Sequence, residues 1–442
     1  MHSFPQIQPG ALNYAIPAPE SQDETQSAAR KIAFWFGVGL VFVRFSMLNE
    51  LFSYIGGHNF YLLYVFGIPA LVGLVVSGGI ARVLRERAGI LWLCFGAWAV
   101  IAIPFSIWRG GSAHTVWPYW KSELLMMFVI GGIMRTWREC RVVMLTIAAA
   151  AAVNIVSFRL FGQVDMTGRR SLDFGTVANA NDFAAHLLMV LPFLVWVSLS
   201  SKSRMLRLAA LGGLGYGIYF VLASGSRGAL VALAVDIMFF TFTARRAYRV
   251  GLWLLAPLIV IIAITVLPSS VVNRLASFSS SQSGASEEAL GSSEARQTLL
   301  RDSIICALRN PVFGIGPGQF VTYEGTKDEL QGTGAYWHNA HNSFAQAASE
   351  CGIPALLLYV AAIWSSWHLL KVVGQHTSRN PQLLRVTNAI FCIRLAMIGF
   401  CTAVFFLNFT YTFYLPAMTG LAIAVASAVH VDRNRRKEVP IG

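Results

Sequence analysis

Runs of about 20 mostly apolar residues recur along the entire chain, and this pattern restricts the possible folds more than any other feature. A helix of that length crosses the hydrocarbon core of a bilayer. Charged residues make up only 12% of the chain, against about 25% in soluble domains. The runs lie near 31–48, 59–79, 88–107, 121–135, 142–160, 183–200, 206–223, 228–243, 250–267, 353–371, 385–407 and 410–430. The sequence therefore predicts an all-α polytopic membrane protein with about 12 transmembrane helices.

Basic residues between the runs predict the orientation. If the N-terminus is cytoplasmic, every second connection is cytoplasmic too, and each of these is rich in Lys and Arg, as the positive-inside rule requires. They are ARVLRERAG (81–89), RTWRECR (135–141), SKSRMLR (201–207), TARRAYR (243–249), KVVGQHTSRNPQLLR (371–385) and DRNRRK (432–437). The net charge of +13 is thus explained by membrane topology and does not indicate a nucleic-acid partner.

The runs divide the chain into five segments. Residues 1–29 are polar and Pro-rich, which predicts a disordered cytoplasmic N-terminus without a cleavable signal peptide. Transmembrane helices 1 to 9 are expected in 30–267 and helices 10 to 12 in 353–431. The connection 268–352 is expected to form a large periplasmic loop, and 432–442 a basic cytoplasmic tail. Both termini would then face the cytoplasm of a bacterium with the protein in its inner membrane.

Several arginines fall in segments predicted to lie outside, where the positive-inside rule does not require them. They are Arg169, Arg170, Arg227, Arg296 and Arg301. A basic residue that topology leaves unexplained favours an anionic ligand. For Arg296 the alternative is a solvated charge on the surface of a helix.

The outer connection contains a predicted amphipathic helix over EARQTLLRDSIICALRN (294–310). Its apolar face would consist of Leu299, Leu300, Ile304, Ile305 and Leu308. A serine at 292 or 293 would cap its start, and the Asn-Pro pair at 310–311 would end it. We expect this helix to lie across the outer ends of the bundle.

Three glycines alternate in the following segment, FGIGPGQF (313–320). A dinucleotide-binding loop is excluded, because it requires a preceding strand and a following helix within a βαβ unit. The glycines indicate either a tight turn that lets the backbone approach a bulky group or a purely structural turn.

Two histidines, His338 and His341, lie three residues apart in WHNAHNSFAQAASECG (337–352). A zinc site needs three or four ligands, and the outer segments offer few others, so we predict no metal and no cofactor. A structural histidine is the stronger reading from the residues alone. If residues 340–351 are helical, His341 shares a face with Phe344 and Ala348.

Cys306 and Cys351 are both predicted outside, where an oxidising compartment would allow them to pair.

Two charged residues, Asp236 and Arg394, fall within apolar runs. Isolated charges inside a bilayer are costly, so a pair between them is the natural expectation. A structural pair is favoured over a proton path, because only one acid and one base are present.

Four motifs resemble those of the O-antigen ligase and polymerase superfamily. His341-Asn342 is followed by nine residues, Gly352 and two more residues, as in the ligase motif, although Ala355 stands where the family has Gly, Thr or Tyr. NPVFGIGPGQF is similar to the family's Pro-x-x-Gly-x-Gly-x-Gly-x-Phe segment. GRRSLDFGTVANANDFAAHLLMVLP resembles its Arg, Gly and Asn-x-Asn stretch, and SGSRGA its Ser-Arg-Gly-Ala turn.

The resemblance implies a GT-C-like, metal-independent and inverting glycosyltransferase that works at the outer leaflet. The donor would be a polysaccharide on undecaprenyl diphosphate, and the acceptor a hydroxyl of lipid A–core. His341 would be the catalytic base. The residues that hold the diphosphate or glycan would be Arg227, Arg296, Arg170, Arg169, His338 and Asn342.

Two other functions remain open at this point. A polymerase of the same superfamily would join carrier-linked repeats, so its acceptor would be another carrier-linked glycan. A polytopic transporter would also suit twelve spans, but the two halves of the chain show no visible repeat and the outer connection 268–352 makes them unequal.

Overall fold

The described part of the chain is almost entirely helical. The computed structural model describes residues 28–164, 169–172, 177, 179–244, 246–269, 271–272, 287–330, 339–379 and 383–438. The first half contains α1 (Ala28–Ser46), α2 (Leu48–Gly56), α3 (Leu62–Val76), α4 (Gly79–Val83), α5 (Arg87–Ala102), η2 (Ile103–Phe105), α6 (Arg109–Pro118), η3 (Tyr119–Glu123), α7 (Leu125–Ile133), α8 (Trp137–Phe161), α9 (Ala180–Ser200) and α10 (Arg204–Ala223). The second contains α11 (Arg227–Thr243), α12 (Arg246–Val266), α14 (Glu287–Arg309), α15 (Phe320–Leu330), α16 (Ser343–Ser378), α17 (Leu384–Ala403), η5 (Val404–Phe406) and α18 (Tyr414–Glu438).

Each of the twelve apolar runs falls on one or more of these helices. Within the described residues, six helices are long and apolar enough to cross a membrane, and a seventh span results if the bent pair α1–α2 is counted as one. α3 and the apolar part of α18, Tyr414–His430, are shorter. The protein is therefore an all-α multi-pass membrane protein, and the number twelve stays a prediction.

The core lies around α9. This helix is largely buried and packs between α8, α10 and α17. α3 and α10 instead expose large apolar side chains, among them Val76 (73% exposed) and Leu208 (69% exposed). An apolar surface of this extent would be a liability in water. It therefore fits the hydrocarbon of a bilayer.

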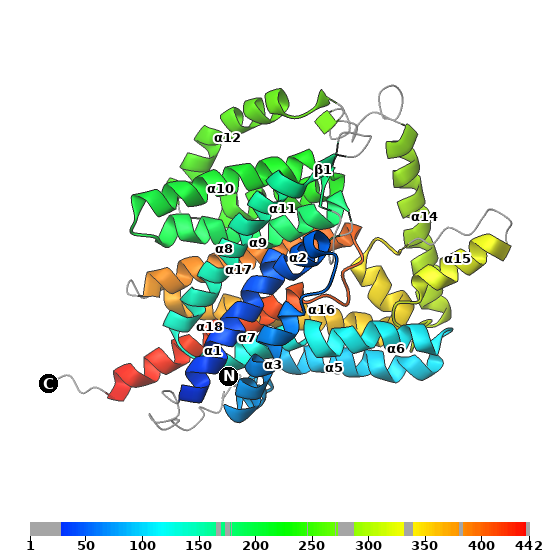
Figure 1. The fold of residues 1–442 in the computed structure, drawn as a ribbon, viewed down its shortest axis with the longest axis horizontal. Coiled ribbons are helices and arrows are strands. Elements are labelled where there is room, and N and C mark those ends of the chain that lie inside the picture. Colours follow the sequence, from blue (N-terminus) through cyan, green and yellow to red (C-terminus); the bar gives the residue numbers. More distant parts are fainter. Residues whose placement is uncertain are drawn as a thin grey trace, which may run out of the picture.

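The two ends of the bundle differ. Arg30 at the start of α1 forms an ion pair of 2.7 Å with Glu139, which sits in the capping box that begins α8. α1 and α8 therefore start at the same end, as alternating spans require. Figure 1 shows α14, α15 and the hairpin of β1 (Gln163–Val164) and β2 (Arg170–Ser171) away from the start of α1 and the end of α18. We call the end with α14, α15 and the hairpin the loop face.

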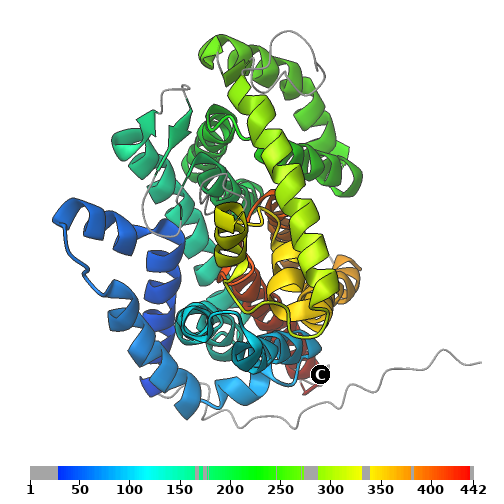
Figure 2. The same cartoon turned by 90° about the vertical axis from the view of Figure 1, so that its right-hand side faces the viewer.

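α14 lies across the loop face, as Figures 1 and 2 both show. It ends at Arg309 as predicted, but it begins at Glu287, so the serines at 292 and 293 do not cap it. The predicted apolar face is only partly correct: Leu299 is buried, whereas Ile304 and Leu308 are exposed. The buried side also includes Ser303, Cys306 and Ala307, and side chains this small let α14 approach α16 closely.

The predicted pair between Asp236 and Arg394 does not form. Asp236 of α11 is buried against the backbone of Gly399, where an added Cβ would lie 2.2 Å from a carboxylate oxygen. The Arg394 guanidinium instead lies over the rings of Trp367, at 4.1 Å, and Phe239, at 5.4 Å. Aromatic faces stabilise a partly buried cation. The prediction of an ion pair considered only a charged partner for Arg394.

Candidate functional site

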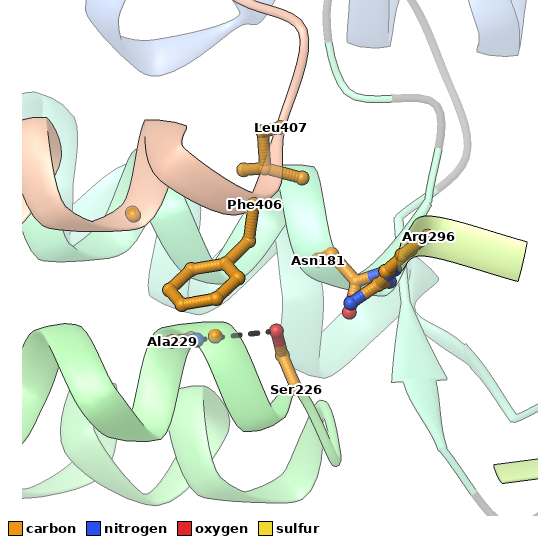
Figure 3. Close-up of a pocket in the computed structure, with 8 residues that line it drawn as sticks. Asn181, Ser226, Ala229, Arg296, Phe406 and Leu407 are labelled. Carbon is orange, nitrogen blue, oxygen red and sulfur yellow. Dashed lines mark hydrogen bonds between the residues drawn. The ribbon is translucent and has the colours of Figure 1, made fainter. Parts of the chain in front are cut away.

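A small pocket opens on the loop face where four distant parts of the chain meet. Its walls come from the start of α9, the start of α11, α14 and the segment that follows α17. The lining residues are Asn181, Ser226, Gly228, Ala229, Arg296, Ala403, Phe406 and Leu407. Figure 3 shows Arg296 beside Asn181, with Ser226 and Phe406 on the other walls. One wall is therefore polar and cationic, and another is apolar.

Two helices begin at this pocket. Asn179 caps α9, because its side-chain oxygen accepts the N–H groups of Asn181 (2.9 Å) and Asp182 (3.1 Å). Ser226 caps α11 by accepting the N–H of Ala229 at 3.3 Å. The start of a helix carries partial positive charge and attracts anions. Together with the Arg296 guanidinium, the two helix starts make this pocket suited to an anionic group.

Arg169 joins the hairpin to both helix starts. Its Nε donates to the backbone oxygen of Ser224 at 2.8 Å, just before α11. Its Nη2 donates to the Asn181 side-chain oxygen at 2.9 Å, in the first turn of α9. These two bonds hold the pocket wall together. The predicted contact of Arg169 with a diphosphate stays a prediction.

The other outer arginines lie on three different elements, α14, α11 and β2. Arg296 lines it. Arg227 is the first residue of α11, between the lining residues Ser226 and Gly228, but is not itself in the lining. Arg170 lies on β2, paired with Val164 of β1. Arg301 is exposed on α14. Only one of the five predicted arginines therefore faces the pocket in this structure.

His341 lies in a turn whose two sides are tied to the pocket region. On one side, Ala340 packs in a small apolar cluster with Leu299, one helical turn from Arg296. On the other side, the Ser343 hydroxyl donates to the backbone oxygen of Leu407, a pocket residue, at 2.7 Å. The partly buried His341 is thereby held between α14 and the apolar pocket wall.

The expected helical start at residue 340 is wrong. His341 has a left-handed backbone (φ 46°), and Asn342 caps α16 by accepting the N–H groups of Phe344 (3.0 Å) and Ala345 (2.9 Å). Asn, which readily competes for backbone N–H groups, is a preferred cap. Asn342 was predicted to bind substrate, but its side-chain oxygen is occupied in this cap. His338 lies outside the described residues.

The three alternating glycines form a structural loop, which we call the glycine loop (313–320). Gly314, Gly316 and Gly318 all have positive φ. The N–H of Gly316 donates to the Glu350 backbone oxygen at 2.8 Å, and that of Gly318 to the Glu350 carboxylate at 2.8 Å. The loop therefore attaches the end of α14 to α16 next to its kink, and the structural reading of the glycines is favoured.

Replacing Gly352 by alanine should destabilise the protein strongly. Gly352 interrupts α16 with φ 82° and ψ 174°, and an added Cβ would lie 2.1 Å from the backbone oxygen of Val312. The strained backbone alone costs about 1–3 kcal/mol, and the clash adds to it. Thermal unfolding of the purified protein in detergent measures the loss.

Gly215 provides the matched control. It lies inside α10, and an added Cβ would meet no atom within 4 Å. Alanine there should stabilise the helix by about 0.5–1 kcal/mol. Equal unfolding temperatures for Gly352→Ala and Gly215→Ala would show that the kink at Gly352 does not pack against the backbone of Val312.

The two outer cysteines do not pair. Both are free and buried. Cys306 approaches the backbone oxygen of Ser349 at 3.9 Å, and burial raises the pKa of its thiol to about 12. Cys351 contacts the Tyr411 hydroxyl at 3.2 Å. In the part of the chain that the structure describes, no three His, Cys, Asp or Glu residues are grouped as metal ligands would be.

Sequence reasoning missed Asn181, Ser226 and Phe406 as pocket residues. Asn181 is the second asparagine of the Asn-x-Asn stretch, and Ser226 precedes the arginine of the SGSRGA turn. Both stretches carry the signal of a helix cap in front of an apolar run. The cap signals at the two helix starts therefore indicate Asn181 and Ser226, but not Phe406.

The fold and the pocket together define a multi-pass membrane protein with an arginine-lined pocket at one end of its bundle. Residues 208–360 match the family model described as O-antigen ligase. This match supports the resemblance of the motifs to the enzymes of the O-antigen ligase and polymerase superfamily. These are membrane glycosyltransferase-type enzymes that use carrier-linked glycans. No curated protein gives a significant match to the chain.

Proposed function

We propose that the protein is an O-antigen ligase: a metal-independent glycosyltransferase that moves a polysaccharide from undecaprenyl diphosphate to a hydroxyl of lipid A–core. The loop face would be the periplasmic face of the bacterial inner membrane, and both termini would be cytoplasmic. The full topology would comprise twelve spans in a GT-C-like arrangement.

The observation that carries this proposal is the pocket on the loop face. It combines an arginine and two helix starts with an apolar wall of Phe406 and Leu407. A lipid diphosphate has the same two parts, a doubly charged head and a hydrocarbon chain. His341 is held beside the pocket through Ala340 and Ser343.

The proposed reaction is a direct displacement at the anomeric carbon. His341 accepts the proton of the acceptor hydroxyl, and the hydroxyl oxygen forms the new glycosidic bond. Imidazole suits this role, because it ordinarily titrates near neutral pH. The bond between the anomeric carbon and the phosphate oxygen breaks, and the diphosphate leaves with the electron pair. Displacement from the opposite side inverts the anomeric centre.

The leaving group needs stabilisation, because its negative charge grows in the transition state. Arg296 can form two parallel hydrogen bonds to phosphate oxygens, which a point charge such as lysine cannot. Arg227 lies between the pocket residues Ser226 and Gly228, and Arg170 follows Arg169 on β2, so both are further candidates for the second phosphate. Preorganised donors of this kind account for much of the rate in phosphate-leaving reactions without a metal.

A ligase and a polymerase of this kind differ in the acceptor. We favour lipid A–core because the His341 motif resembles that of the ligases. Deletion of the gene, followed by gel analysis of surface polysaccharide, tests this assignment. A ligase deletion leaves unsubstituted core together with carrier-linked polymer. Core that carries a single repeat would identify a polymerase, and an unchanged polysaccharide pattern would contradict both.

A further inference from the structure

We propose that the Asn181 amide and the Ser226 hydroxyl donate hydrogen bonds to the diphosphate of the donor lipid, and that Arg169 positions the Asn181 amide for this. The inference rests on the proposed function and adds three residues with defined roles to it. Its geometric basis is the hydrogen bonding around the pocket.

The orientation of the Asn181 amide follows from its contact with Arg169. An arginine side chain carries only donors. The Asn181 atom that faces Arg169 Nη2 at 2.9 Å must therefore be the oxygen. This leaves the Asn181 NH2 group, which has no partner among the described residues, on the side of the amide away from Arg169. Figure 3 shows the Asn181 side chain beside Arg296 in the pocket.

The Ser226 hydroxyl is constrained in a similar way. Its oxygen accepts the N–H of Ala229 at 3.3 Å as the cap of α11, the contact drawn as a dashed line in Figure 3. The hydroxyl hydrogen donates to no described residue. Since Ser226 lines the pocket, this hydrogen is available to a bound group.

The polar lining therefore presents donors. Arg296 has only N–H groups, the Asn181 oxygen is used by Arg169, and the Ser226 oxygen is used by the helix cap. A diphosphate, whose oxygens accept hydrogen bonds, fits such a lining. A sugar hydroxyl also needs an acceptor for its own hydrogen and fits less well. The pocket should therefore bind the diphosphate of the donor and leave the glycan outside.

The test measures the affinity of the full-length protein in nanodiscs for undecaprenyl diphosphate without a glycan. Asn181→Ala removes one donor to a charged group, and the affinity should fall by about tenfold or more. Asn181→Asp replaces the donor by a negative charge and should lower affinity about 100-fold or more. An acid in the first turn of a helix is favourable, so Asn181→Asp should fold.

Ser226 is tested with variants that keep the cap. Ser226→Thr retains both the cap and the hydroxyl hydrogen, so the affinity should stay within about threefold of wild type. Ser226→Asp retains the cap but loses the donor and adds a negative charge, so the affinity should fall about 100-fold. Equal affinity of these two variants would overturn the assignment of Ser226.

A double-mutant cycle tests the role of Arg169. Arg169→Ala alone should weaken binding, because the Asn181 amide is no longer held. In an Asn181→Ala background, Arg169→Ala should weaken binding by much less, since there is no amide left to position. Fully additive effects would contradict a positioning role. The Michaelis constant for the acceptor should not change in any of these variants.

The outcomes separate this inference from the proposed function. If the wild-type protein does not bind undecaprenyl diphosphate, the proposed function is wrong. If the wild type binds it and Asn181→Asp binds equally well, the donor function stands and this inference is wrong.

Discussion

Substitution of His341 is expected to slow glycan transfer by about 10²–10⁴-fold, the usual contribution of a general base. Asparagine is the informative replacement, because His341 has a left-handed backbone with φ 46°. Asn adopts this conformation more readily than most residues, whereas alanine would add strain. His341→Asn should therefore remove the base without disturbing the turn. The rate of transfer from carrier-linked glycan to lipid A–core measures the effect.

Binding provides the control for this experiment. His341→Asn should bind undecaprenyl diphosphate as tightly as wild type, because the base acts on the acceptor hydroxyl and not on the diphosphate. Its thermal stability should also be close to that of wild type. A variant that transfers at the wild-type rate would show that His341 is not the base.

The second large effect is expected at Arg296, the only arginine that lines the pocket in the described part of the chain. Arg296→Ala should raise the Michaelis constant for the carrier-linked donor by about 10–100-fold, which corresponds to a charged hydrogen bond of about 1.5–3 kcal/mol. Arg296→Lys should recover only part of this loss, because an ammonium group cannot form the two parallel bonds of a guanidinium.

Arg301 supplies a matched control on the same helix. It lies five residues after Arg296 and carries the same charge, but it is exposed. Arg301→Ala changes the general electrostatic attraction of the loop face as much as Arg296→Ala does, so its effect on the donor should be small. Similar losses for the two variants would show that the arginines act only through the overall charge of this face.

The sequence predicted the all-α, multi-pass character of the protein, because each apolar run is a local signal, whereas the number of twelve spans stays a prediction. It did not predict where α16 breaks: Gly352 appeared only as a motif position, and its close approach to the backbone of Val312 is set by the folded structure. The sequence also predicted only part of the side of α14 that is buried in the structure. Hydrophobicity favoured Ile304 and Leu308, whereas close packing on α16 selected small residues.

The candidate site was less accessible to sequence reasoning. Arg296, which was predicted from an unexplained charge, lines the pocket. The role of His341, which the motif suggested, stays a prediction. The bonds of Arg169 were not predictable, because charge alone does not reveal which arginine bonds to a neighbouring backbone. The Arg169–Asn181 contact joins the hairpin to α9 through the folded arrangement, and Phe406 enters the pocket from a segment with no motif.

The most direct test of the proposed function is an electron cryomicroscopy structure of the His341→Asn variant in nanodiscs with undecaprenyl diphosphate bound. We expect density for a phosphate between Arg296, Asn181 and Ser226, with the first isoprene units against Phe406 and Leu407. A diphosphate bound elsewhere on the protein, with this pocket closed or filled only by side chains, would contradict the assignment of the pocket as the donor site.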